Sequence, residues 1–258
     1  GMDAVPVLEG AWENSFDNII QERIENIIHN IQLDDLYSEL QVWSQSGGND
    51  LLKGHLLVSK FQYPDLDVES ITRQIGSLSQ DIWLELNPKL TALEKIKVIN
   101  HVIYEINKFS GNKLNINAPD NYYLNVLMNS KKGNPVSLGA LYIALAQGLG
   151  IPVYGVNLPR HFILAYLEDI SPRAEAADIE DRKVLFYINP FNQGALFTRN
   201  EIELYIKQLS LSDNRMYYSG CKNRVIIERM MEELILQYKN SGNQNKVEEL
   251  TRLKRAIE

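Results

Sequence analysis

The sequence of 258 residues contains a single cysteine, Cys221, and no long uninterrupted run of apolar residues. One cysteine excludes an intramolecular disulfide and fits a reducing compartment. No apolar run approaches the ~20 residues that a membrane-spanning helix needs. The N-terminus also lacks the basic-then-apolar order of a signal peptide. We therefore expect a soluble, cytoplasmic protein with no membrane partner.

The sequence also lacks an excess of basic residues. It has 26 Lys and Arg against 33 Asp and Glu, which gives a formal net charge of −7. The basic residues are scattered along the sequence, and no run of consecutive basic residues is longer than a pair such as Lys131-Lys132. A nucleic-acid groove needs a basic face that displaces counterions from the phosphates, so we expect no nucleic-acid partner. The hydrophobic content of 45% is that of an ordinary globular chain.

No pattern of metal ligands is found among the four histidines. His29, His55 and His101 fall on apolar helical stretches without metal-ligand spacing. We therefore expect neither a metal nor a cofactor.

The first ~110 residues show the periodicity of helices and no alternation typical of strands. Apolar residues at helical spacing predict one helix from Phe16 to Ile31 and a second from Leu33 to Trp43. Thr91 and Glu94 have the spacing of a capping box. The remaining helices of this part are predicted over 51–61, 67–78 and 91–106.

The character of the sequence changes after residue 112. A short helix is predicted over 122–128, and a long one from Pro135 to Gly148 that ends at Gly150-Ile151-Pro152. Three β-rich segments predict one antiparallel sheet, with the charged stretch 168–183 as a mobile hairpin tip. These strands are predicted over 153–157, 161–167 and 184–188, and a further helix over 198–209.

The C-terminal residues 223–258 predict a helical hairpin that turns at Ser241-Gly242-Asn243. Its size is that of one tetratricopeptide-type unit, and a single unit is expected to serve packing because such units need about three copies to be stable. The predicted fold class is therefore α+β and mostly helical. We expect a helical N-terminal region (1–112), a core with the small sheet (113–212) and a C-terminal helical hairpin (213–258).

Three residues in the predicted core have the order of a nucleophile, a base and an orienting group. Ser137 lies in the first turn of the helix that begins at Pro135, with Asn134 as its cap. Free N–H groups at such a helix start stabilise anions. His161 begins a strand, and Asn189 ends another, where it could accept from the imidazole N–H.

From about Asn100 to Phe191 the sequence resembles the bacterial SirB-type transglutaminase-like proteins. This resemblance implies a transglutaminase-like core related to the papain-like fold, with helices packed on a small antiparallel sheet. The segments that carry it are Asn100-His101-Val102-Ile103-Tyr104, Phe109-Ser110-Gly111-Asn112, Gly133-Asn134-Pro135-Val136-Ser137-Leu138, Gly155-Val156-Asn157-Leu158-Pro159-Arg160-His161-Phe162 and Tyr187-Ile188-Asn189-Pro190-Phe191.

The resemblance implies a Cys at the start of the long helix, a strand His and an Asp. Here His161 matches the His and Asn189 stands where the Asp is expected. Counting back from Gly150 without a gap puts the Cys position at Pro135, whereas matching by chemistry puts it at Ser137. Because serine is a weaker nucleophile than a thiolate, Ser137 would need a well-built base and oxyanion hole.

Two function classes follow from this comparison. In the first, the site is degenerate and the protein is a non-catalytic regulatory module that binds a peptide or protein, with contacts from Asn134, Pro135, Arg160 and Tyr142. In the second, Ser137, His161 and Asn189 perform serine-dependent acyl transfer of the amidase, protease or esterase type. The altered nucleophile and orienting residue favour the first class, and transglutaminase activity is not expected. The oligomeric state and the partner stay open.

Overall fold

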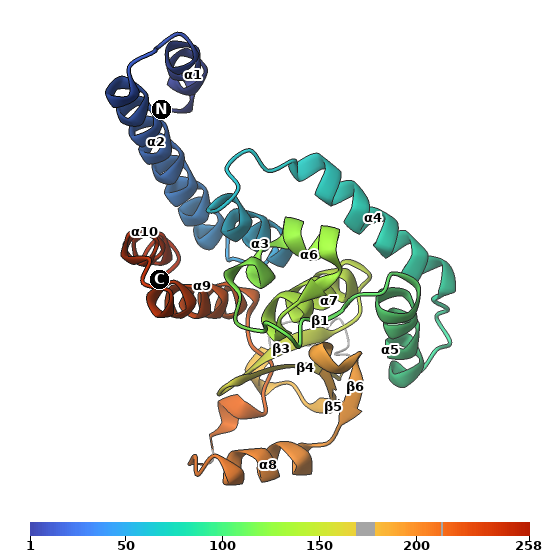
Figure 1. Cartoon of the computed structure of the whole chain (residues 1–258). Coiled ribbons are helices and arrows are strands. Elements are labelled where there is room, and N and C mark those ends of the chain that lie inside the picture. Colours follow the sequence, from blue (N-terminus) through green and yellow to red (C-terminus); the bar gives the residue numbers. More distant parts are fainter. Residues whose placement is uncertain (169–178, 213) are drawn as a thin grey trace.

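The computed structural model describes residues 1–168, 179–212 and 214–258, so most of the predicted hairpin tip at 168–183 lies outside the described residues. Its helices and small sheets confirm the predicted α+β, mostly helical class (Figure 1). Among the described residues, no helix is both long and apolar enough to cross a bilayer. The α-helices are α1 (Val5–Glu13), α2 (Asn18–Gln45), α3 (Leu51–Lys60), α4 (Val68–Glu85), α5 (Ala92–Asn100), α6 (Leu124–Ser130), α7 (Pro135–Gly148), α8 (Arg199–Gln208), α9 (Asn223–Asn240) and α10 (Gln244–Lys254).

The central sheet is antiparallel with the strand order β3-β4-β5-β6. The three predicted strands are confirmed as β3 (Val153–Leu158), β4 (His161–Leu167) and β5 (Val184–Asn189). The strand β6 (Ala195–Phe197) was not predicted, because three residues are too few to establish an alternation. A separate two-residue parallel pair joins β1 (Ser110–Gly111) to β2 (Lys132–Gly133).

Helices cover the two faces of this sheet. Along β4, Phe162, Leu164 and Tyr166 belong to the large hydrophobic cluster that contains α7, whereas the alternate residues Ile163 and Ala165 belong to a second cluster. That second cluster includes Ile202 and Ile206 of α8, which lies below the sheet in Figure 1. Side chains alternate in direction along a strand. The even-numbered residues of β4 therefore point toward α7, and the odd-numbered ones point toward α8.

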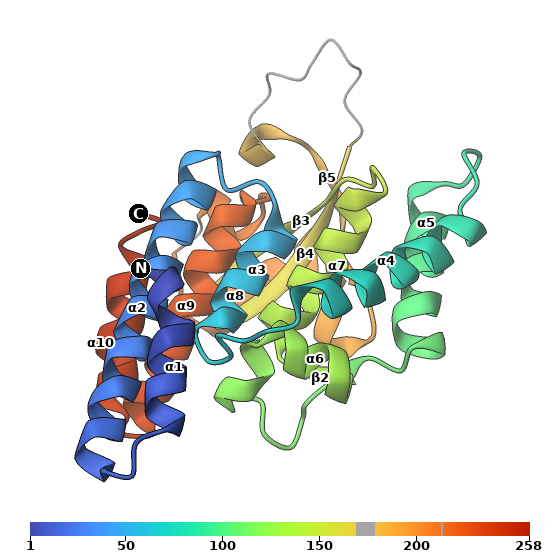
Figure 2. The same cartoon turned by 90° about the horizontal axis from the view of Figure 1, so that it is seen from above.

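The N-terminal prediction of two helices is wrong. The segments 16–31 and 33–43 are parts of one helix, α2, because no Gly or Pro interrupts the sequence between Asn18 and Gln45. With α1, which was not predicted, the first half of α2 forms an arm that projects from the body (Figure 1). Figure 2 shows the same helices from above, next to α9 and α10. Several apolar side chains of the arm are consequently exposed, and Phe16 is fully so.

The C-terminal hairpin is confirmed, with α9 and α10 joined through residues 241–243. Gly242 has a φ of +75°, a backbone conformation that suits glycine at a helix end. One hydrophobic cluster includes Leu40 of α2, Leu141 of α7 and Leu250 of α10. The three segments of the chain thus all contribute to this cluster. The boundaries at 112 and 212 stay a prediction, as does the tetratricopeptide-type resemblance.

Candidate functional site

The start of α7 is closed by a reciprocal cap. The backbone N–H of Ser137 donates to Asn134 Oδ1 at 2.8 Å, and the backbone N–H of Asn134 donates to Ser137 Oγ at 3.1 Å. The Ser137 hydroxyl in turn donates to the Asn134 carbonyl at 3.3 Å. Asn134 and Ser137 are therefore a capping box, in which each side chain satisfies a backbone donor that the helix leaves free.

This cap determines what the Ser137 hydroxyl can do. The Ser137 side chain is fully buried, and its oxygen both accepts and donates within the helix start. A nucleophilic serine instead needs its oxygen bonded to a base and open to a substrate. No hydrogen bond in the described part of the chain joins Ser137 to His161.

His161 lies toward the opposite face of the sheet from α7. Along β4 it is two residues before Ile163 and four before Ala165, so its side chain lies on the same face of the sheet as theirs, which packs with α8. Its ring lies 5.8 Å from that of Tyr205, a residue of α8. The neighbouring residue Phe162 is the one that meets α7. The strand thus presents an apolar ring to the helix start and turns its histidine away.

Asn189 caps the short 3₁₀ helix Pro190–Asn192. Its Oδ1 accepts from the backbone N–H groups of Phe191 and Asn192, each at 3.1 Å. The described side-chain hydrogen bonds of Asn189 therefore serve the turn after β5, and none of them orients His161.

The other residues that the sequence singled out lie apart from one another. Pro135 is the half-buried first residue of α7. Arg160 is exposed at the second position of the two-residue turn between β3 and β4, with a φ of +58°. Tyr142 is buried, and its hydroxyl donates to Asn100 Oδ1 at 2.9 Å, which ties α7 to α5.

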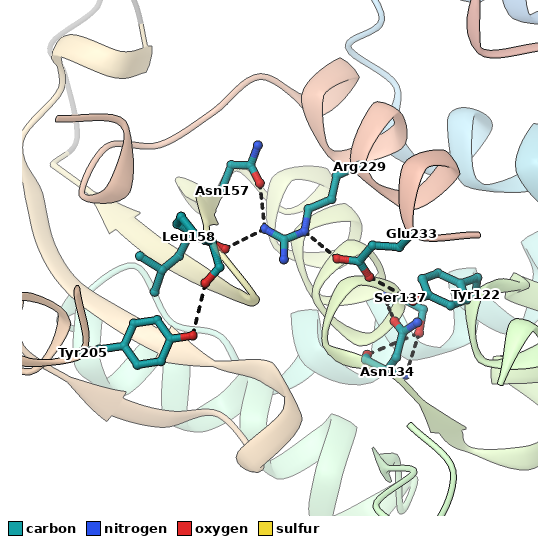
Figure 3. A network of polar contacts seen from close by, with 9 residues as sticks. Tyr122, Asn134, Ser137, Asn157, Leu158, Tyr205, Arg229 and Glu233 are labelled. Carbon is teal, nitrogen blue, oxygen red and sulfur yellow. Dashed lines mark hydrogen bonds and ion pairs between the residues drawn. The ribbon is translucent and has the colours of Figure 1, made fainter. Parts of the chain in front are cut away.

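A chain of polar contacts runs from the cap of α7 to the β3–β4 turn (Figure 3). The Tyr122 hydroxyl, near Asn134, donates to Glu233 Oε2 at 3.0 Å, and Arg229 Nε donates to Glu233 Oε1 at 2.8 Å. Arg229 Nη1 then donates to Asn157 Oδ1 at 2.7 Å and to the Leu158 carbonyl at 2.9 Å. Helix α9 thereby connects the start of α7 to the end of β3.

The electrostatics of the site follow from this arrangement. Burial lowers the pKa of His161, and the positive charge of Arg229 lowers it further. Burial raises the pKa of Tyr122, and the neighbouring carboxylate of Glu233 raises it again. Both groups are therefore held neutral near neutral pH. Arg229 also lies over the Phe162 ring at 5.5 Å, so a cation stands above the strand residue that faces α7.

The sequence's one thiol does not supply a nucleophile. Cys221 is buried, and burial raises the pKa of its thiol to about 12. The thiolate is the reactive form of cysteine, so this residue is inert at neutral pH. The described residues contain no group of three or more His, Cys, Asp and Glu side chains placed to hold a metal ion.

Sequence reasoning missed Tyr205, Arg229 and Glu233 as neighbours of the candidate site. Arg229 and Glu233 are four residues apart on an amphipathic helix, a spacing that usually indicates a solvated ion pair. No local signal distinguishes this pair from Arg224 and Glu228, which lie five residues earlier on the same helix. Only the packing of α9 against the sheet brings Arg229 to the site, where its side chain is 11% exposed.

A family model described as the transglutaminase-like superfamily matches residues 69–232. The match covers most of the chain, and the protein belongs to this superfamily. The matched range includes α7, the central sheet and the part of α9 that carries Arg229. The predicted transglutaminase-like core is thereby confirmed at the level of the superfamily.

Individual relatives come from animals and bacteria. F-box only protein 21 of Mus musculus is 28% identical over 173 residues, which are 67% of this chain and 26% of the mouse protein. A UPF0162 protein of Xylella fastidiosa (strain 9a5c) is 25% identical over 198 residues, which are 74% of this chain and 66% of that protein. The chain thus spans about a quarter of the length of the mouse relative. No solved structure matches it.

Proposed function

We propose that this chain is a transglutaminase-like module of the SirB type whose site is degenerate, and that it binds a peptide or protein without turning it over. The observation that carries the proposal is the burial of the Ser137 hydroxyl in the cap of α7. Pro135, the other candidate for the nucleophile position, has no side-chain nucleophile. The assignment to the SirB type is supported by the five ordered motifs between Asn100 and Phe191.

A binding role is supported by the groups that remain near the β3–β4 turn. Arg229 uses Nε and Nη1 in internal hydrogen bonds, whereas its Nη2 has no hydrogen-bond partner among the described residues (Figure 3). His161 is half-buried and lies against Tyr205. The Arg229 guanidinium, whose charge also lowers the pKa of His161, offers a directional contact to a peptide carbonyl or carboxylate.

The alternative is serine-dependent acyl transfer by Ser137, His161 and Asn189. It would require the Ser137 hydroxyl to leave both of its contacts with Asn134, and His161 to reach α7 from the opposite face of the sheet. It would also require Asn189 to release two backbone N–H groups. These rearrangements weigh against the alternative, and no observation favours it.

Chemical labelling tests the absence of catalysis. The purified protein and its Ser137→Ala variant are exposed to a fluorophosphonate probe, beside a known serine hydrolase, and adducts are located by mass spectrometry. We expect labelling of the hydrolase alone. An adduct on Ser137 that disappears in both Ser137→Ala and His161→Ala would overturn the proposal in favour of acyl transfer.

Peptide selection tests the binding role. Phage-displayed peptides are selected on the wild-type protein, and the enriched peptides are titrated against Arg229→Gln and against Arg224→Gln, a matched change on the same helix. We expect amide NMR signals of the β3–β4 turn to shift, and affinity to fall in Arg229→Gln alone. A selection that enriches no peptide, or equal affinity in both variants, would contradict binding at this site.

A further inference from the structure

A cavity of about 470 Å³ lies beside β5 and the first turn of α8. Its wall is closed by the short 3₁₀ segment Arg215–Tyr217 and the residues that follow it. The volume is in the range of small-ligand sites. None of the residues assigned to the candidate site above lines this cavity.

The cavity is positively charged in a protein that is negatively charged as a whole. Among the described residues that line it, four are cationic and one, Glu180, is a carboxylate, which leaves three positive charges in excess in this set. The complete chain has a formal net charge of −7. The cationic residues are Arg182, Lys183, Arg199 and Arg215. Such a local reversal of charge attracts anions to this point of the surface.

Arg182 is fixed in position without a compensating carboxylate among the described residues. Its Nη1 donates to the Tyr154 hydroxyl at 3.3 Å, and its Nη2 donates to the Glu168 carbonyl at 2.8 Å. The guanidinium lies over the Tyr154 ring at 5.4 Å. Its buried Nε has no hydrogen-bond partner in the described part of the chain. The charge of Arg182 is thus held in place and left for a ligand to neutralise.

The other three cations are paired with carboxylates that do not line the cavity. Arg199 Nε lies 3.1 Å from Glu203, Arg215 Nη2 lies 2.6 Å from Asp181, and Lys183 Nζ lies 3.7 Å from Glu168. The three cationic side chains are 62–71% exposed, so these pairs contribute little and exchange readily. Arg199 is also stacked on Tyr218 at 4.3 Å, which orients its guanidinium.

We propose that this cavity binds the phosphoryl group of a phosphate monoester. Three guanidinium groups and an ammonium exceed what one carboxylate needs, whereas a phosphate dianion presents three oxygens to such a set. Tyr187 and Tyr218 also line this cavity, belong to the hydrophobic cluster on the α8 side of the sheet, and offer an aromatic surface for the organic part of the ester. This inference does not rest on the proposed function, because it concerns different residues.

Calorimetric titration of the whole protein with phenyl phosphate at low salt tests this site. We expect saturable one-to-one binding that is weakened about tenfold by Arg199→Gln and about tenfold by Arg182→Gln, because each change removes a charge-assisted contact. Benzoate, which carries the same ring on a carboxylate, is expected to bind at least about tenfold more weakly than phenyl phosphate. Circular dichroism of each variant verifies that it is folded.

Arg73→Gln is the matched control, since Arg73 is exposed on α4 and does not line the cavity. We expect it to bind phenyl phosphate as the wild type does. Equal weakening of phenyl phosphate binding in Arg73→Gln would mean that the loss of affinity comes from the overall charge of the protein. Benzoate binding as tight as that of phenyl phosphate would mean that the site binds carboxylates. Either result, or unchanged affinity in folded Arg199→Gln, overturns the proposal.

A second pair of titrations distinguishes the source of the phosphoryl group. A capped phosphotyrosine tripeptide is compared with phenyl phosphate on the wild type and on Arg199→Gln. Tighter binding of the tripeptide, lost in the variant, assigns the site to phosphorylated protein segments. Tighter binding of phenyl phosphate assigns it to small phosphate esters. Failure of both to bind contradicts the inference.

Discussion

Gly139 of α7 and Phe162 of β4 are in close contact, so that a Cβ atom built on Gly139 would lie 2.5 Å from Phe162 Cε1. This approach sets α7 directly against the sheet, with the Phe162 ring filling the space beside the helix. It also fixes which residue of β4 faces α7. Because side chains alternate along a strand, the contact of Phe162 with α7 directs His161 to the other face.

Replacement of Gly139 by alanine is expected to destabilise the protein by about 1–3 kcal/mol, because the added methyl group has no space against Phe162. Urea denaturation measures the change. Gly76→Ala is the matched control, since a Cβ at Gly76 in α4 would meet nothing within 4 Å. That change is expected to stabilise by up to about 1 kcal/mol through helix propensity. Similar effects of the two substitutions would contradict the close contact.

Ser137→Ala is expected to lower the free energy of unfolding by about 1–2 kcal/mol, because it leaves the buried N–H of Asn134 without its partner. Ser77→Ala on α4 removes an exposed hydroxyl that donates to the Arg73 carbonyl, and it is expected to change stability by less than about 0.5 kcal/mol. Thermal and urea unfolding compare the two variants. A Ser137→Ala protein as stable as the wild type would mean that the hydroxyl does not serve the cap.

The sequence predicted local features well and the site's geometry poorly. Asn134, Pro135 and Gly150 carry the beginning and end of α7 in their own backbone preferences, and the helix lies where they place it. The order of Ser137, His161 and Asn189 was also visible. The order of these residues does not determine to which face of the sheet the side chain at a strand end points. That depends on the register of β4 against its neighbours.

The same limit explains the N-terminal arm and the contribution of α9. The spacing of Ile19, Ile20 and Ile27 indicated a buried helix face, yet these side chains are exposed because the arm extends beyond the helices that could cover it (Figure 1). Arg229 comes to the site from a helix about ninety residues after α7 begins. Periodicity reports which residues share a face and not what that face packs against.

His55 is expected to make stability depend on pH. It is buried on α3, and burial lowers its pKa to about 4, an effect that the bond from its ring to the Tyr122 carbonyl partly offsets. Because the pKa in the unfolded chain is higher, at about 6.5, the unfolded state binds more protons between these values. Stability is therefore lost as the pH falls from about 6.5 to 4, by as much as about 3 kcal/mol.

Urea midpoints measured at several pH values between 7 and 4 compare the wild type with His55→Gln. This change removes the titrating group and is expected to flatten the pH dependence, whatever its effect on stability at pH 7. If His55→Gln keeps the full wild-type slope, the buried histidine is not its source.

Arg229 is expected to depress the basicity of His161 across the β3–β4 turn. Burial is the larger cause of the lowered pKa of His161, and the positive charge of Arg229 is the second. Arg229→Gln should therefore raise that pKa, whereas Arg229→Lys keeps the charge and should leave it low. NMR titration of the imidazole signals measures the pKa of His161 in both variants.

Arg224→Gln on the same helix is the control. Arg224 pairs with Glu228 at 3.3 Å, and its replacement is expected to leave the His161 titration unchanged. If the pKa of His161 is unchanged or lower in Arg229→Gln, the charge of Arg229 does not act on His161. Arg229 would then not belong to the proposed binding site.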